Sequence, residues 1–73
     1  MSRTFDVAVV GATGAVGQTM IQVLEERGFP VGKLYPLASA RSVGKKVEFK
    51  GSYYTVQDLA TFDFSQVKIA LFS

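Results

Sequence analysis

Three glycines at three-residue intervals, Gly11, Gly14 and Gly17, form the part of this chain best suited to chemistry. They follow the apolar run Val7–Val10 and precede a segment with helical periodicity. A turn of this kind that opens a helix presents free backbone N–H groups and the positive end of the helix dipole, and both favour a bound phosphate. A side chain at Gly11 or Gly14 would obstruct the turn or the approaching phosphate. Gly17, one turn into the helix, is expected to allow close packing of helix on strand.

This spacing is the GxxGxxG form of the dinucleotide-binding βα turn, rather than the commoner GxGxxG. A glycine motif alone would also suit a tight turn without a ligand. Here the motif follows a strand pattern and opens a helix pattern, which phosphate binding by this mechanism requires. We therefore predict that the turn binds a nucleotide.

A second anchor for a nucleotide is expected about 20 residues after the glycines, where many NAD-binding folds place an acid that bonds the ribose 2′-OH. The window Pro36–Ser42 contains no acid and carries Ser39, Arg41 and Ser42. A carboxylate would repel a 2′-phosphate, whereas two hydroxyls and a guanidinium attract one, the latter by a bidentate, charge-assisted contact. The window favours NADP over NAD. The alternative is an exposed loop with a solvated Arg41.

The periodicity around these motifs predicts an α/β fold with a Rossmann-like parallel sheet. The expected elements are a strand over Asp6–Val10, a helix over Ala15–Arg27, a strand over Lys33–Ala38, a hairpin of Lys46–Lys50 and Tyr53–Val56 that turns at Gly51–Ser52, a loop with one helical turn over Asp58–Gln66, and a strand over Val67–Phe72. Pro36 cannot donate to a ladder, so the second strand is expected to be short or interrupted.

The expected helix carries apolar residues at helical spacing, and we predict a buried stripe of Val16, Met20, Val23 and Leu24. One helix cannot cover both faces of three parallel strands, and a domain this short buries only about 60% of its unfolded surface. We therefore expect residues 1–73 to be the N-terminal part of an NADP-binding domain. The rest of that domain, and a catalytic and dimerisation domain, are expected in a longer protein.

Composition narrows the function classes further. The chain has no cysteine and no histidine, so disulfides, thiolate metal sites and imidazole bases are excluded within it, and no metal site is expected. A net charge of +2 with scattered Lys and Arg gives no argument for nucleic acid. No apolar run approaches the roughly 20 residues of a membrane helix, and Asp6 interrupts any signal-peptide pattern. The default location is the cytoplasm.

Several segments together resemble the N-terminal part of aspartate-semialdehyde dehydrogenases. They are the glycine motif 11–17, Leu37-Ala38-Ser39-Ala40-Arg41-Ser42-Val43-Gly44-Lys45, Asp63-Phe64 and Ile69-Ala70-Leu71-Phe72-Ser73. The Leu-Ala-Ser-Ala-Arg-Ser segment is the specific part, because many unrelated reductases share the glycine motif. The resemblance implies that Thr13, Gly14, Ala15 and Val16 line the NADP phosphates, and that Ser39, Arg41 and Ser42 hold the 2′-phosphate.

The resemblance also implies a reaction, the NADPH-dependent reductive dephosphorylation of aspartyl 4-phosphate to the semialdehyde, which feeds lysine, threonine and methionine synthesis. The family uses a cysteine nucleophile and a histidine acid/base, which this chain lacks, so no catalytic residue is assigned within it. A full-length protein is expected to act on a small acyl phosphate or semialdehyde as a homo-oligomer. Lys45, Lys46 and Lys50 are interpreted as solvated.

Three other functions fit the same motifs. N-acetyl-glutamyl-phosphate reductase performs the same chemistry on a related acyl phosphate, although the Leu-Ala-Ser-Ala-Arg-Ser segment argues against it. An atypical short-chain reductase or NADP sensor would also open with Gly-Ala-Thr-Gly. Its Tyr-x-x-x-Lys pair is missing here, because Gln57 and Asp58 stand four residues after Tyr53 and Tyr54. A non-catalytic paralogue that keeps the fold is the third.

Overall fold

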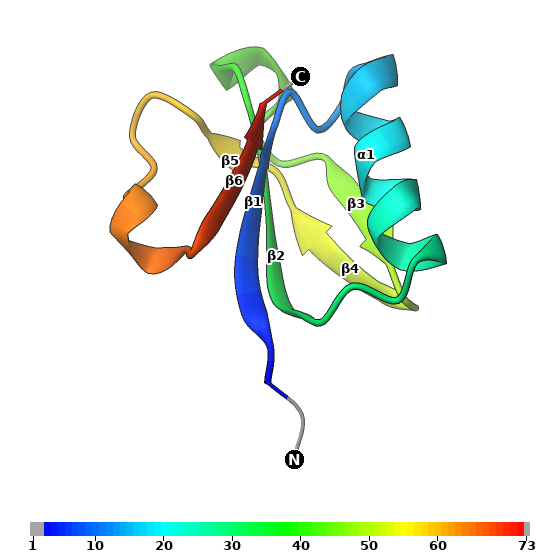
Figure 1. Cartoon of the computed structure of the whole chain (residues 1–73). Helices are drawn as coiled ribbons and strands as arrows, with labels where there is room; N and C mark the ends of the chain where they lie inside the picture. The colour runs from blue at the N-terminus through cyan, green and yellow to red at the C-terminus, as the bar shows by residue number, and fades with distance from the viewer. Residues whose placement is uncertain (1–2, 73) are drawn as a thin grey trace.

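Strand β1 (Phe5–Val10) lies inside a four-stranded parallel sheet of order β5-β2-β1-β6 in the computed structural model, which describes residues 3–72 (Figure 1). The other elements are α1 (Ala15–Glu26), β2 (Val31–Ala38), the 3₁₀ turn η1 (Ala40–Ser42), β3 (Lys46–Phe49), β4 (Ser52–Thr55), β5 (Gln57–Asp58), the 3₁₀ turn η2 (Phe64–Gln66) and β6 (Ile69–Phe72). The predicted α/β fold with a parallel sheet and an inserted hairpin is confirmed. The two-residue strand β5 was not predicted.

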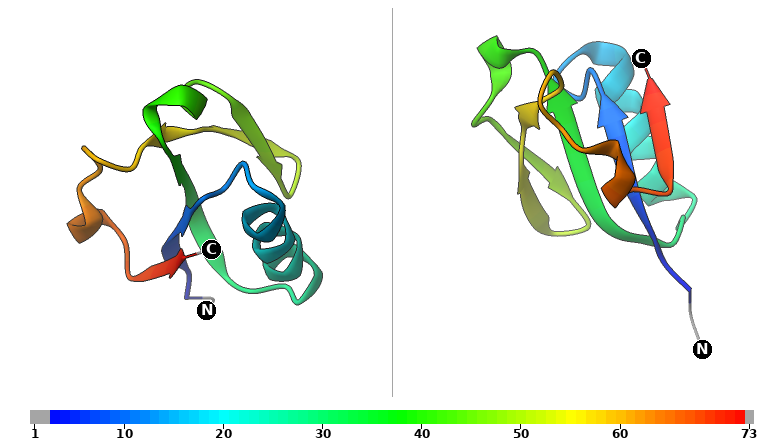
Figure 2. Two further views of the ribbon diagram at one scale, coloured as in Figure 1. Left: turned by 90° about the horizontal axis from the view of Figure 1, so that it is seen from above. Right: turned by 90° about the vertical axis from the view of Figure 1, so that its left-hand side faces the viewer.

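Helix α1 and the β3–β4 hairpin cover one face of the sheet, as the views from two sides agree (Figure 2). The helix buries Gly17 and Ile21 and half-buries Met20 and Leu24. The predicted stripe is therefore wrong at two positions, since Val16 is 61% exposed and Val23 39%. Close packing of Gly17 on the preceding turn rotates the helix so that Ile21, one turn further on, points into the core.

The loop between β5 and β6 covers the other face of the sheet (Figure 2). Its side chains pack on the second core cluster, Ala8, Val10, Tyr35 and Leu37, and the rings of Tyr35 and Phe62 lie 5.2 Å apart. The cover that we expected a longer chain to provide is thus supplied in part by this loop. At its helical turn the Asp63 carboxylate accepts hydrogen bonds from the Ser65 Oγ and N–H, which lower the pKa of Asp63.

The β3–β4 hairpin turns one residue earlier than predicted. Phe49 pairs with Ser52, so Lys50 and Gly51 form the two-residue loop, with φ of 51° and 80°. A type I′ turn needs positive φ at both central residues, and its twist matches that of the flanking strands. Val47 and Phe49 face the core, as the alternation predicted, and Phe49 is buried in the cluster beneath α1.

Strand β2 runs without interruption through Pro36, contrary to the prediction. Pro36 is buried and pairs with Val9 of β1. The Leu37 carbonyl accepts from the turn after β1, whereas the Ala38 carbonyl accepts from Leu59 on the opposite side. Because polar groups alternate along a strand, the Pro36 nitrogen faces away from β1, and β5 pairs only with Leu37 and Ala38. No ladder bond to β1 is lost, which explains why the proline is tolerated.

The rotated helix makes a packing prediction. Ile21→Ala should destabilise the protein by about 2–5 kcal/mol, because it empties a buried site between helix, sheet and hairpin. Val16→Ala on the exposed flank should change the stability by less than about 0.5 kcal/mol. Denaturant unfolding of both variants, followed by circular dichroism, is the measurement. Equal losses would contradict this orientation of α1.

Candidate functional site

The carboxyl ends of β1 and β2 meet at one edge of the sheet, where the glycine turn and η1 lie side by side (Figures 1 and 2). The N–H groups of Gly11 and Ala12 both donate to the Leu37 carbonyl, at 2.8 and 3.1 Å. These bonds tie the turn after β1 to the end of β2. In open α/β sheets ligands bind outside the carboxyl ends of the strands, where the strand order reverses. Strand order 2-1-6 places that reversal at β1.

Two of the three glycines are required by the backbone itself. Gly11 has a φ of 79°, a conformation that L side chains rarely adopt. A Cβ at Gly17 would lie 2.0 Å from the Gly11 carbonyl oxygen and 2.9 Å from the Ala12 Cα, so only glycine lets the helix approach the turn this closely. The predicted packing role of Gly17 is confirmed.

Gly14 differs from the other two, because the fold does not need a glycine there. It is the N-cap of α1 with a φ of −82°, and a Cβ would meet only the Gly11 oxygen, at an ordinary 3.5 Å. No side chain caps the helix, whose first turn leaves the N–H groups of Ala15, Val16 and Gly17 without intrahelical acceptors. The missing side chain opens the approach to these donors. The arrangement fits a phosphate at this turn.

The structure brings the two predicted anchors together. The Thr13 hydroxyl of the glycine turn donates to Ser42 Oγ of η1 at 3.4 Å, with both residues half-buried. The Ser42 N–H donates to the Ser39 carbonyl at 2.9 Å, which closes η1. Arg41 lies exposed on the same turn, and no hydrogen bond of its side chain is found within residues 3–72. A guanidinium and hydroxyls at the end of β2 therefore border the glycine turn.

One acid that the sequence window missed lies near this edge. Asp58 ends β5 and pairs with Ala38, the residue before Ser39. Its Oδ1 accepts the Ala60 N–H at 2.9 Å, which holds the carboxylate to the following loop. Asp58 lies on the far side of β2 from the glycine turn, because β5 and β1 flank β2. No local signal in the sequence could reveal this neighbour, since it depends on an unpredicted strand.

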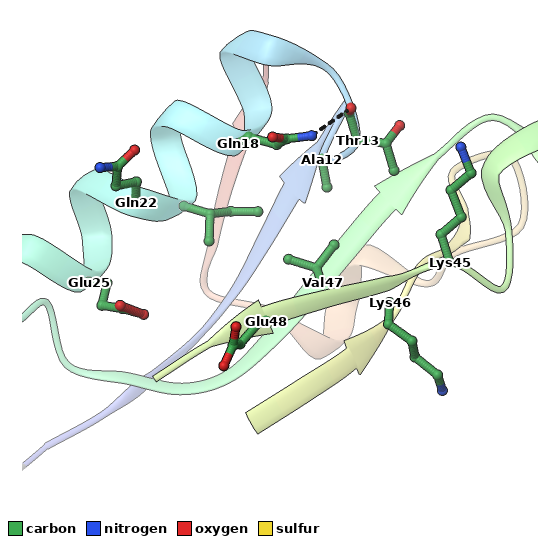
Figure 3. Close-up of a pocket in the computed structure, with 10 residues that line it drawn as sticks. Ala12, Thr13, Gln18, Gln22, Glu25, Lys45, Lys46, Val47 and Glu48 are labelled. Carbon is green, nitrogen blue, oxygen red and sulfur yellow. Dashed lines mark hydrogen bonds between the residues drawn. The ribbon is translucent and has the colours of Figure 1, made fainter. Parts of the chain in front are cut away.

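A groove of about 560 Å³ runs between α1 and β3 from the glycine turn to the far end of the helix (Figure 3). Thr13 and Gln18 lie at one end, where the Gln18 Nε2 donates to the Thr13 carbonyl at 3.0 Å. Glu25 lies at the other end and accepts the Lys50 N–H at 2.7 Å. The groove thus joins the glycine turn to the hairpin, and its end nearest Thr13 carries no carboxylate among the residues that line it.

The three lysines interpreted as solvated differ in their contacts, although Lys45 and Lys46 both border the groove. Lys50 Nζ donates to the Phe29 carbonyl at 3.3 Å, and Lys46 Nζ donates to Thr55 Oγ at 2.6 Å. Lys45 lines the groove beside Thr13. All three are exposed, as the interpretation as solvated requires, although Lys46 and Lys50 also form surface hydrogen bonds. The alternation of the strand 46–49 was the signal that could have separated Lys45 from Lys46.

Neither a metal site nor a membrane-spanning helix is found among residues 3–72. Among residues 3–72, no group of three or more carboxylates, histidines or cysteines is placed to hold a metal ion. The single α-helix that the structure describes is too short and too polar to cross a membrane.

The chain is similar in sequence and in structure to known dehydrogenases. Residues 6–73 match the family model described as "Semialdehyde dehydrogenase, NAD binding domain". The whole chain is 64% identical to an aspartate-semialdehyde dehydrogenase of Legionella pneumophila and 58% identical to that of Shewanella violacea, and covers 21% and 22% of their lengths. A crystal structure of aspartate semialdehyde dehydrogenase II from Vibrio cholerae, complexed with ASA, superposes with a TM-score of 0.95 at 58% identity, over 97% of this chain and 23% of that one. The chain thus spans about a fifth of the length of these relatives.

The two inner glycines should respond differently to the same change. Gly14→Ala should leave the melting temperature nearly unchanged, because its Cβ fits within the fold, yet weaken nucleotide binding by obstructing the first-turn N–H groups. Gly17→Ala should lower the melting temperature markedly, because its Cβ would collide with the backbone of the turn. Calorimetric titration and thermal melting of both variants give the comparison. If both variants lose stability and keep their nucleotide affinity, the turn is structural only.

Proposed function

This chain belongs to the semialdehyde dehydrogenase family through its NAD-binding domain, and on that premise we propose that it is the cofactor-binding segment of an NADP-dependent aspartate-semialdehyde dehydrogenase. The Thr13–Ser42 hydrogen bond supports a dinucleotide across this edge, and the acid-free window with Arg41 favours NADP. The hydrogen bond joins the phosphate-binding turn to the loop that carries Arg41. A dinucleotide with a 2′-phosphate needs both of these parts next to each other.

Each part of the edge would have its own task. The first-turn N–H groups of α1 bind the pyrophosphate, because they lack intrahelical acceptors and lie at the positive end of the helix. Arg41 and the hydroxyls of Ser39 and Ser42 hold the 2′-phosphate by charge-assisted hydrogen bonds. Thr13 keeps the two anchors in register through Ser42. NADPH, when bound, supplies the hydride of the reaction.

The proposed reaction of the whole protein is the reductive dephosphorylation of aspartyl 4-phosphate to aspartate semialdehyde. The nucleophile and the proton-transfer group must lie outside these 73 residues, because the chain contains neither cysteine nor histidine. The task of this segment is therefore to hold and orient the cofactor. We propose that the full-length enzyme is a cytoplasmic homo-oligomer.

Cofactor choice is the first test of this proposal. The full-length protein should bind NADP more tightly than NAD, and Arg41→Ala should remove most of the difference. One lost charge-assisted contact is worth roughly 1.5–3 kcal/mol, or about ten- to a hundredfold in affinity. Arg27→Ala, at the opposite end of α1, is the matched control and should change neither affinity. Equal affinities of the unmutated protein for the two cofactors, measured by titration calorimetry, would contradict the proposal.

The isolated segment provides a second test. Residues 1–73 alone should show no NADP-dependent turnover of aspartate semialdehyde with phosphate, since they lack a nucleophile and an acid/base. We also expect them to be marginally folded or self-associated, because β6 is an apolar strand at the edge of the sheet. Turnover assays and sedimentation of the purified segment measure these properties. Measurable turnover would overturn the assignment of catalysis to residues outside the segment, and a monomer that melts cooperatively would disprove the folding argument.

A further inference from the structure

We propose that Lys45 is a second cation for the adenosine 2′-phosphate, and that it acts with Arg41 to determine the preference for NADP. The inference rests on the proposed function, because it assumes that the 2′-phosphate binds beside η1. It assigns a specificity role to a residue that the sequence pattern left in solvent.

The alternation of the hairpin sets the direction of this side chain. Val47 and Phe49 of β3 face the core beneath α1, whereas Lys46 and Glu48 are exposed. Because successive side chains of an extended strand point to opposite faces, Lys45 shares the face of Val47. That face is turned toward α1 and the glycine turn. In Figure 3 the Lys45 side chain extends toward the end of the groove where Thr13 lies, and Lys46 extends away from it.

The backbone of Lys45 is held beside η1 by two hydrogen bonds of its own and by one of Gly44. The Lys45 N–H donates to the Ser42 carbonyl at 3.2 Å, and the Lys45 carbonyl accepts the N–H of the buried Val56 at 2.8 Å. The neighbouring Gly44 N–H donates to the Val56 carbonyl at 3.1 Å. Lys45 therefore starts from a fixed point next to Ser42, whose hydroxyl meets Thr13.

Lys45 differs from Lys46 and Lys50 because its side chain has no hydrogen-bond partner among residues 3–72 and is available for a ligand. Lys46 is hydrogen-bonded to Thr55, and Lys50 to the Phe29 carbonyl at the far end of α1. Within residues 3–72, no side-chain hydrogen bond of Lys45 is found.

Charge around the proposed phosphate favours a second cation. A 2′-phosphate at η1 would face Arg41, but Asp58 borders the same end of β2 and opposes an anion. Lys45 approaches from the groove, whose carboxylates Glu25 and Glu48 lie toward the other end from Thr13, and so adds attraction at the end beside η1. Lysine contributes as a flexible point charge rather than a bidentate fork, so its effect should be smaller than that of Arg41 and more sensitive to salt.

The test uses the full-length protein and calorimetric titration with NADP, NAD and adenosine 2′,5′-bisphosphate. Lys45→Gln should weaken NADP and the bisphosphate by roughly three- to tenfold at low salt while NAD stays within about twofold. Lys45→Arg keeps the charge and should retain the preference. Lys46→Gln is the matched control, because its partner is Thr55, and should change none of the three affinities. Thermal melting of each variant confirms that it is folded.

The results distinguish the role of Lys45 from the proposed preference for NADP, on which it rests. If the unmutated protein does not prefer NADP, the proposed cofactor is wrong and the role of Lys45 falls with it. If the preference exists and depends on Arg41 but Lys45→Gln leaves it intact, the inference alone is overturned. An equal loss for NADP and NAD would also overturn it, because the lysine would then contact a part that both cofactors share.

Discussion

The seating of α1 on the turn before it determines the geometry of the site. With no Cβ at Gly17, the first turn of the helix rests against the carbonyl of Gly11, where any side chain would overlap the backbone. This contact sets both the rotation of the helix and the position of its N-terminus above β1. The rotation directs Ile21 into the core, and the position aims the free N–H groups at the carboxyl edge of the sheet. The absence of a side chain at Gly17 thus determines both how α1 packs and where its N-terminal N–H groups lie.

The same edge shows how backbone bonds hold two separate segments in register. The Leu37 carbonyl accepts from both Gly11 and Ala12, so the end of β2 cannot shift without moving the glycine turn. The side-chain bond from Thr13 to Ser42 extends this coupling to η1. Residues about 30 positions apart in the chain are therefore joined by hydrogen bonds at the edge where we propose that the dinucleotide binds. If the dinucleotide binds there as proposed, two anchors that are already joined need less ordering on binding.

Elements that depend on neighbouring residues could be predicted from the sequence, whereas those that depend on tertiary contacts could not. The glycine turn, α1 and the hairpin follow from spacing and alternation, which neighbouring residues determine. The helix stripe was misassigned at Val16 and Val23, because helix rotation depends on the contact of Gly17 with Gly11 rather than on hydrophobicity. Pairing between β2 and β5 leaves no pattern in a two-residue strand, so the neighbour Asp58 could not be foreseen.

Pro36 makes the two sides of the sheet differ in how regularly their strands can pair. Its nitrogen points away from β1, so the outer side of β2 lacks a donor at that level, and β5 pairs with β2 only beyond the proline, at Leu37 and Ala38. The opposite edge, at β6, presents the four residues Ile69–Phe72 in regular register with β1 and contains no proline. Regular pairing is therefore limited to two residues beside β2, whereas β6 pairs with β1 over four residues. Within the described residues, the outer edge of β6 is thus the one that offers a regular row of backbone groups for pairing.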